Sequence, residues 1–264
     1  MRDNRYCDIL GKEQAMLYEC WLTVAQSKRL IARAVAKMDV VRKALKEGYV
    51  VVAAGTTNTY VLEEILGEKV EHFSFTSGIT TPVGKKPDLA DIKNRRMYLV
   101  IEKGEPKPDV TSEDALKNFG SGDVFIKGAN ALNYAGGIAG MLIGHPMGGT
   151  IGAALGPVTG RKAHLIIPVG LEKEIPHSII DLAQQVPYEE HRGKVCGIFP
   201  FTGTIVTEIE AFNILYDVEA FPVAAGGISG AEGGVRFHIS GNEASLKNVE
   251  KGVSELREEH AFGK

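Results

Sequence analysis

A run of small polar residues directly follows the apolar segment Val50–Ala54. It consists of Gly55, Thr56, Thr57, Asn58 and Thr59. An apolar segment with no polar member is typical of a strand that is covered on both faces in a parallel sheet, and hydroxyl or amide side chains favour the start of a helix. Such a junction directs unpaired backbone N–H groups and the positive end of the helix dipole at one place, where anions bind. We therefore predict that these five residues contact an anionic ligand; the alternative is that they only cap the helix.

Two ionisable residues flank the short apolar segment 124–126. Asp123 precedes it and Lys127 follows it, so we take both as candidate catalytic residues. A lysine at the carboxyl end of a strand can hold a phosphate or polarise a carbonyl group, whereas the alternative is a surface ion pair. Gly128 and Asn130 come next, and Ser77 opens another small-residue loop. Because ligands lie beyond the carboxyl ends of strands in α/β sheets, we predict that these three residues bind substrate.

Other chemical motifs give little support for a metal or a cofactor. Glu172 and Glu174 follow an apolar segment that ends at Val169, and they either face the pocket or are solvated at the surface. His145 has no placed partner and is expected to be structural. The histidines show no metal-binding spacing, and no nucleotide-binding glycine motif or nucleophile elbow occurs. We therefore predict no metal and no cofactor.

Hydrophobic periodicity, together with glycine, proline and helix-capping residues, predicts the helices and strands that position these residues. We expect strands at 50–54, 70–76, 97–102, 123–127, 163–170, 194–199 and 235–240. We expect helices at 13–47 (interrupted near 26–27), 57–66, 112–120, 178–185 and 243–259, with Asn242 as the last N-cap. Residues 1–12 and 84–96 are expected to be irregular, and 223–234 flexible. The segment 128–160 is too rich in glycine for a long helix, because each interior glycine costs about 0.8–1 kcal/mol.

Strands alternating with helices predict an α/β fold up to residue 200. We expect residues 1–200 to form an open, mostly parallel twisted sheet flanked by helices, which is a Rossmann-like arrangement. Residues 201–264 are then a small α+β subdomain that serves as a lid or an interface. The basic residues between Lys28 and Lys46 are expected on the solvated face of an amphipathic helix.

Composition limits the class of partner. The 264 residues are 44% hydrophobic and 24% charged, and the formal net charge of −3 provides no basic field for nucleic acid or an anionic membrane. The cysteines number three and show no C-x-x-C spacing, which indicates a reducing compartment. The polar beginning of the chain is unlike a signal peptide. No apolar run reaches the roughly 20 residues that span a bilayer. We expect a cytoplasmic homo-oligomer whose partner is a small phosphorylated or carboxylated ligand.

Two short motifs resemble known sugar-phosphate enzymes. The order helix, Gly48, strand, Gly-Thr-Thr-Asn-Thr, helix resembles the opening of ribose-5-phosphate isomerase, in which a similar loop lies at the sugar-phosphate site. The stretch Ile126–Leu132 is similar to the Lys-Gly-Gly-Gly-Gly-Ala-Leu segment of that enzyme. It is also similar to a segment of methylthioribose-1-phosphate isomerase and the initiation-factor-2B regulatory subunits. The resemblance covers about residues 28–170 and implies the superfamily that also contains coenzyme A transferases.

The same comparison shows departures that bear on catalysis. Asn130 stands where the methylthioribose family has its catalytic aspartate, and Gly136 stands where ribose-5-phosphate isomerase has its general-base glutamate. An amide cannot act as a general acid or base at neutral pH. The leading hypothesis is an isomerase-like enzyme with altered catalytic residues. The alternatives are a non-catalytic effector-binding or regulatory subunit, and a coenzyme A transferase-like enzyme with Glu172 as nucleophile.

Overall fold

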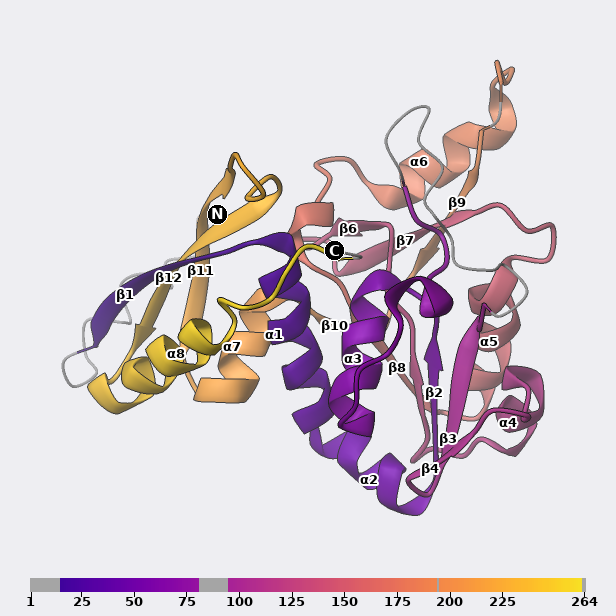
Figure 1. Cartoon of the computed structure of the whole chain (residues 1–264). Helices are drawn as coiled ribbons and strands as arrows, with labels where there is room; N and C mark the ends of the chain where they lie inside the picture. The colour runs from indigo at the N-terminus through magenta and orange to yellow at the C-terminus, as the bar shows by residue number, and fades with distance from the viewer. Residues whose placement is uncertain (1–14, 81–94, 194, 263–264) are drawn as a thin grey trace.

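A six-stranded mixed sheet forms the centre of the structure, a computed structural model that describes residues 15–80, 95–193 and 195–262 (Figure 1). Its strands are, in spatial order, β10 (Thr204–Val206), β8 (His164–Pro168), β5 (Val124–Ile126), β2 (Tyr49–Ala53), β3 (Tyr98–Glu102) and β4 (Glu105–Lys107). The first four run parallel to one another, whereas β3 and β4 pair in antiparallel fashion. The predicted α/β class is therefore confirmed, with a mixed sheet.

The strand β2 is covered on both faces, as the apolar run predicts. Val50 and Val52 point into one core and Val51 and Ala53 into the other, because successive side chains of a strand alternate. All four are fully buried. The first core is closed by α1 (Val24–Lys37), α2 (Asp39–Glu47), α3 (Thr56–Leu66) and α7 (Glu208–Tyr216), and the second by α4 (Ser112–Asn118) and α5 (Gly149–Gly160).

A small antiparallel sheet joins the two ends of the chain. It consists of β1 (Met16–Leu22), β12 (Gly234–Gly241) and β11 (Glu219–Gly226), with α8 (Glu243–Glu255) against it. Figure 1 shows this unit beside the large sheet, with α1 lying between them. The predicted boundary at residue 200 falls between strands of both sheets, because β1 lies in the small sheet and β10 lies in the large one.

A third sheet projects beyond the carboxyl ends of the parallel strands. It consists of β6 (Ala131–Asn133), β7 (Ile138–Ile143) and β9 (Gly197–Phe201). The short helices η4 (Leu171–Lys173), α6 (Ile179–Gln185) and η5 (Val186–Tyr188) follow β8 along the chain. The strand β7 turns the glycine-rich segment back toward the large sheet, where two of its residues reach the cavity described below.

Several predicted elements are wrong for identifiable reasons. The expected helix at 13–47 begins with strand β1, whose partner β12 lies more than two hundred residues away. The expected strand at 70–76 contains the short 3-10 helix η2 (His72–Phe75), which Glu71 caps. Helix α5 forms within the glycine-rich segment because Ile151, Ala154 and Val158 are buried against the core, and packing outweighs propensity.

The remaining differences are smaller. Part of the segment 223–234 is strand, because β11 extends to Gly226. The predicted strands at 97–102, 123–127 and 163–170 are confirmed with shorter bounds, and the strand at 235–240 with longer ones. The Asn242 N-cap is also confirmed. The predictions for residues 1–12 and most of 84–96 lie outside the described residues. In the part of the chain that the structure describes, no helix has the length and apolar character needed to cross a bilayer.

Candidate functional site

A cavity of about 320 Å³ opens at the carboxyl ends of β2 and β5. Eight of the ten residues that we predict to be catalytic or substrate-binding line this cavity. They are Gly55, Thr56, Thr57, Asn58, Ser77, Lys127, Gly128 and Asn130. Further lining residues come from β7 (Met141, Leu142), α1 (Lys28) and η4 (Lys173). Six separate segments of the described chain therefore surround one space.

The amino-terminal turn of α3 faces this cavity without a side-chain cap. Gly55 is the N-cap residue, and it has no side chain to accept the first N–H groups of the helix. The N–H groups of the first turn lack carbonyl acceptors within the helix. No side chain of this segment caps α3. The first-turn N–H groups therefore need acceptors from outside the helix.

The hydroxyl group of Thr57 is the second unusual feature of this turn. The Thr57 side chain is 2% exposed, and its oxygen has no hydrogen-bond partner among the described residues. A buried hydroxyl without a partner costs about 1–3 kcal/mol, so proteins rarely retain one without use. Thr57 lines the cavity, with its hydroxyl oxygen buried in the wall.

Asn58 and Thr59 instead hold the backbone in place. The Asn58 amide donates to the carbonyl oxygens of Ala53, at 2.7 Å, and Ile126, at 3.4 Å, and so joins the ends of β2 and β5. The Thr59 hydroxyl donates to the carbonyl oxygens of Gly55 and Phe75. Thr59, predicted as a substrate-binding residue, therefore points away from the cavity that its neighbours line.

Three lysines from different elements reach the same cavity. Lys127 lies just after β5 and is 7% exposed, and Lys28 on α1 is 8% exposed. Lys173 on η4 is half-buried, and its Nζ donates to the carbonyl oxygen of Ala129 at 2.7 Å. None of the three forms an ion pair with a carboxylate of the described chain within 4.0 Å. An anion in the cavity would supply the missing negative charge.

The prediction that Lys28 lies on a solvated helix face is wrong. Its neighbours one turn along α1 are Ile31 and Ala32, both fully buried, which places Lys28 on the packed side of the helix. That apolar spacing is the signal by which the sequence could have identified it. Lys173 could have been found with Glu172 and Glu174, since all three follow the same strand end.

Burial changes the proton affinity of these lysines. Burial, together with the nearby charge of Lys173, lowers the pKa of Lys127 to about 8. It also lowers the pKa of Lys28 to about 8, although Glu172 and Glu208 act in the opposite direction. Burial lowers the pKa of Lys173 too. At neutral pH the cavity is therefore positively charged, and its amines lose protons far below the usual range of lysine.

Two carboxylates lie behind the lysines rather than in the cavity lining. Glu208 is fully buried and accepts a hydrogen bond from the Leu171 N–H group at 2.9 Å. Both carboxylate oxygens of Glu172 are buried with no hydrogen-bond partner among the described residues. The Glu172 side chain packs so closely on Gly170 that a Cβ there would lie 1.8 Å from its Oε2. Burial, together with the charge of Glu172, raises the pKa of Glu208.

The remaining candidate residues have structural roles. Asp123 lies at the opposite end of β5 from Lys127, where its carboxylate accepts the N–H groups of Tyr49 and Gly120, each at 2.6 Å. It does not line the cavity, so the structure separates the two predicted catalytic residues. Glu174 accepts the Tyr134 N–H group, and His145 accepts that of Met147.

Both polar atoms of the Asn130 amide group form hydrogen bonds. Its Nδ2 donates to the carbonyl oxygen of Gly78 and its Oδ1 accepts the N–H group of Leu142, both at 3.0 Å. The side chain therefore ties the loop that begins at Ser77 to β7 across the cavity. It positions two walls of the site.

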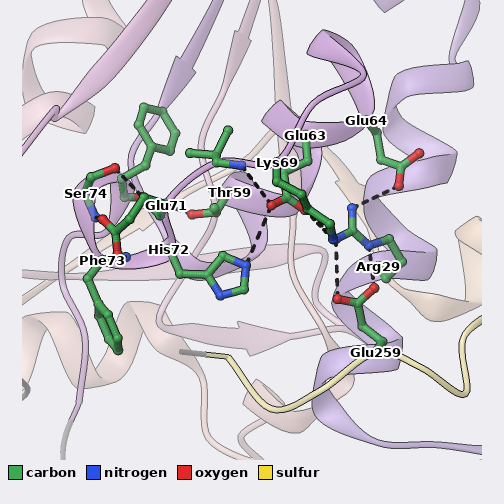
Figure 2. Close-up of polar contacts among 12 residues, drawn as sticks. Arg29, Thr59, Glu63, Glu64, Lys69, Glu71, His72, Phe73, Ser74 and Glu259 are labelled. Carbon is green, nitrogen blue, oxygen red and sulfur yellow. Dashed lines mark hydrogen bonds and ion pairs between the residues drawn. The ribbon is translucent and has the colours of Figure 1, made fainter. Parts of the chain in front are cut away.

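A network of charges anchors α1 to α3 beside the cavity (Figure 2). The guanidinium of Arg29, 5% exposed, contacts Glu63, Glu64 and Glu259, with distances of 3.0 Å to Glu64 and 2.8 Å to Glu259. Burial opposes the charge of Arg29, but the hydrogen bonds to Glu259 and Glu63 outweigh it and raise its pKa. The prediction of a solvated face is wrong for Arg29 as well.

The carboxyl-terminal segment closes this network. In Figure 1 it runs from α8 across α1 toward η2, and in Figure 2 Glu259 meets Arg29 from that segment. The Phe262 ring stacks on His72 and lies near Tyr60, and the Lys28 Nζ is 6.0 Å from its centroid. The segment therefore touches a residue that lines the cavity.

Within the described residues, no group of three His, Cys, Asp or Glu side chains is placed to hold a metal ion. Comparisons with models of protein families, with curated proteins and with solved structures gave no match to this chain. The resemblance to sugar-phosphate isomerases therefore rests on its short motifs alone.

Proposed function

We propose that the cavity binds a small phosphorylated or carboxylated molecule. The observation that carries this proposal is the buried Thr57 hydroxyl, which has no partner in the described chain and lies in the uncapped first turn of α3. Helix amino termini of this kind bind phosphate through their N–H groups. The lysines at positions 28, 127 and 173 supply opposite charge at the same cavity.

The proposal is tested by the thermal stability of the protein in inorganic phosphate and in sugar phosphates. A ligand that binds only the folded state raises stability by about 2.7 kcal/mol at one hundred times its Kd. We expect stabilisation by phosphate compounds at millimolar concentration, and a loss of that effect in Lys28→Met. The matched control is Lys37→Met, an exposed lysine on the same helix. No stabilisation by any phosphate or carboxylate compound would contradict the proposal.

The chemistry of the lining narrows the kinds of reaction. Among the described residues, the cavity lining contains no Asp, Glu, His, Cys or Tyr. The proton transfer of a sugar-phosphate isomerase would then fall to a lysine, since no carboxylate reaches the cavity from the described chain. Glu172 is not among the lining residues, which disfavours acyl transfer with that residue as the nucleophile.

The second candidate function is a non-catalytic effector-binding subunit, and Asn130 favours it. The amide stands where the related isomerases have an acid, and both its ends are engaged in holding the walls of the cavity. Incubation of the protein with individual sugar phosphates, followed by NMR of the mixture, separates the two functions. Conversion of any of them would exclude the effector-binding role, whereas binding without conversion would support it.

A further inference from the structure

We infer that Lys127 is a nucleophilic amine that forms a Schiff base with the carbonyl group of an anionic ligand. This inference rests on the proposed function, because it assumes that the phosphate or carboxylate group of the ligand occupies the turn at Thr57. It narrows the ligand to phosphorylated or carboxylated aldehydes and ketones. Lys127 would then be the catalytic residue of the cavity.

The surroundings of Lys127 distinguish it from the other two lysines. Its side chain forms no hydrogen bond or ion pair with any residue that the structure describes, whereas the Lys173 Nζ is already bonded to the Ala129 carbonyl oxygen at 2.7 Å. The charge that acts on Lys127 is the cation Lys173, and no carboxylate contributes. Lys28 has the carboxylates of Glu172 and Glu208 close enough to favour its charged form.

These conditions keep an amine reactive. A lysine becomes nucleophilic when burial or an adjacent cation shifts it toward the neutral form, and both act on Lys127. The free amine needs space for a carbonyl compound, and the cavity of about 320 Å³ provides it. The apolar side chains of Ala129 and Met141 line the same space.

The backbone around Lys127 fixes its position. The Lys127 N–H group donates to the Ile166 carbonyl oxygen at 3.0 Å, which extends the pairing of β5 with β8. Gly128 then passes close to the end of β8, where a Cβ would lie 3.3 Å from the Pro168 carbonyl oxygen. The amine therefore projects from a rigid strand end rather than from a mobile loop.

The step is a condensation without a redox change. The lone pair of the neutral Lys127 Nζ forms a bond to the carbonyl carbon, and the C=O electron pair moves onto the oxygen, which takes up a proton. The carbinolamine then loses this hydroxyl as water while the nitrogen loses its remaining proton. One carbonyl compound and one amine thus give one imine and one water.

The experiment uses pyridoxal 5′-phosphate as a probe that carries both an aldehyde and a phosphate. The full-length protein is incubated with it, reduced with borohydride and digested, and the modified lysines are located by mass spectrometry. We expect one dominant adduct, on Lys127. Excess inorganic phosphate should suppress it, and pyridoxal, which lacks the phosphate, should give about tenfold less, the effect of one lost charge-assisted contact. Lys127→Arg should lose the adduct and keep the positive charge.

The outcomes separate this inference from the proposed function. A dominant adduct on Lys28 or Lys173, or labelling of Lys127 no greater than that of the exposed lysines, would overturn it. Stabilisation by inorganic phosphate, measured without any aldehyde, reports on anion binding alone. If phosphate stabilises the protein and Lys127 stays unmodified, the Schiff base is wrong and the anion site stands. Because the adduct is located in the natural chain, a variant that fails to fold does not affect the test.

Discussion

The ring of Phe262 lies flat against the imidazole of His72, with their centroids 4.2 Å apart and their planes inclined by 8°. Three residues earlier in this final segment of the described chain, the Glu259 carboxylate binds Arg29, in a contact that spans 230 residues of sequence. The carboxyl-terminal segment is thus bound to α1 and η2 through two different kinds of contact. Lys28 precedes Arg29 on α1, lines the cavity and has its Nζ 6.0 Å from the centroid of the Phe262 ring. The segment therefore contacts one wall of the site.

Replacing Phe262 with Ala is expected to lower the free energy of unfolding by about 1–2 kcal/mol, because the ring stacks on His72 and contacts Tyr60 and Phe73. Urea denaturation measures this loss. Phe262→Tyr keeps the stacked ring and should stay near the natural stability. Equal stability of the Ala variant would show that the segment is not bound in solution.

Replacing Arg29 with Met is expected to be more damaging, at about 3–5 kcal/mol, because it leaves the Glu63 carboxylate buried without its principal counter-charge. Arg33, one turn further along α1, pairs with the more exposed Glu255 and provides the matched control. Arg33→Met should cost no more than about 1 kcal/mol. Similar losses for both variants, measured by urea denaturation, would argue against a buried network around Arg29.

Replacing Thr57 with Val should affect stability and binding in opposite directions. The variant removes a buried hydroxyl that has no partner in the described chain, so the free protein should be as stable as the natural one or more so. Phosphate affinity, measured by calorimetry, should fall by about tenfold when one hydrogen bond to a charged group is lost.

Thr59→Val is the matched control for this experiment. Its hydroxyl donates to two backbone carbonyl oxygens, so the variant should lose about 1 kcal/mol of stability. If Thr57→Val were destabilising and left phosphate affinity unchanged, the Thr57 hydroxyl would have a structural partner instead of a ligand.

The pH dependence of the site follows from its lysines. Below pH 8 Lys28 and Lys127 are charged, and above it they lose their protons, because the pKa of each is about 8. Phosphate affinity should therefore fall as the pH rises through this value, which calorimetry at several pH values measures. A phosphate affinity that stays constant from pH 6 to pH 9 would contradict charged lysines at the site.

The stability of the free protein should change in the opposite sense. Between the folded pKa of about 8 and the ordinary lysine pKa of 10.5, the unfolded chain binds more protons at these lysines than the folded chain does. The free energy of unfolding contributed by them therefore rises with pH over that interval. Lys127→Met should reduce this rise, whereas the exposed Lys37→Met should not.

The parts of the fold that could be predicted are those that local sequence determines. The run from Val50 to Ala54 has no polar residue and forms the buried strand β2. Asn242 caps α8 with its own side chain. The polar residues after β2 and β5 could be assigned to one sheet edge because parallel strands bring their carboxyl ends together. Each of these inferences depends on neighbours in sequence.

The parts that could not be predicted depend on distant partners. Residues 16–22 form a strand because β12 pairs with them, and no local pattern reveals that partner. The lysines at 28 and 173 reach the cavity because tertiary packing places α1 and η4 around it. Asp123 has the residue type of a catalytic acid, yet its carboxylate holds backbone N–H groups at the other end of β5.

The pairing of β1 with β12 also determines when the protein can finish folding during synthesis. Glu19 on β1 contacts Arg236 on β12, and 217 residues separate them. The ribosome must therefore synthesise the chain through residue 241 before β1 can pair fully with β12. Until then, Tyr18, Cys20 and Leu22, which pack inward in the finished molecule, face the solvent on a nascent chain with an unpaired edge.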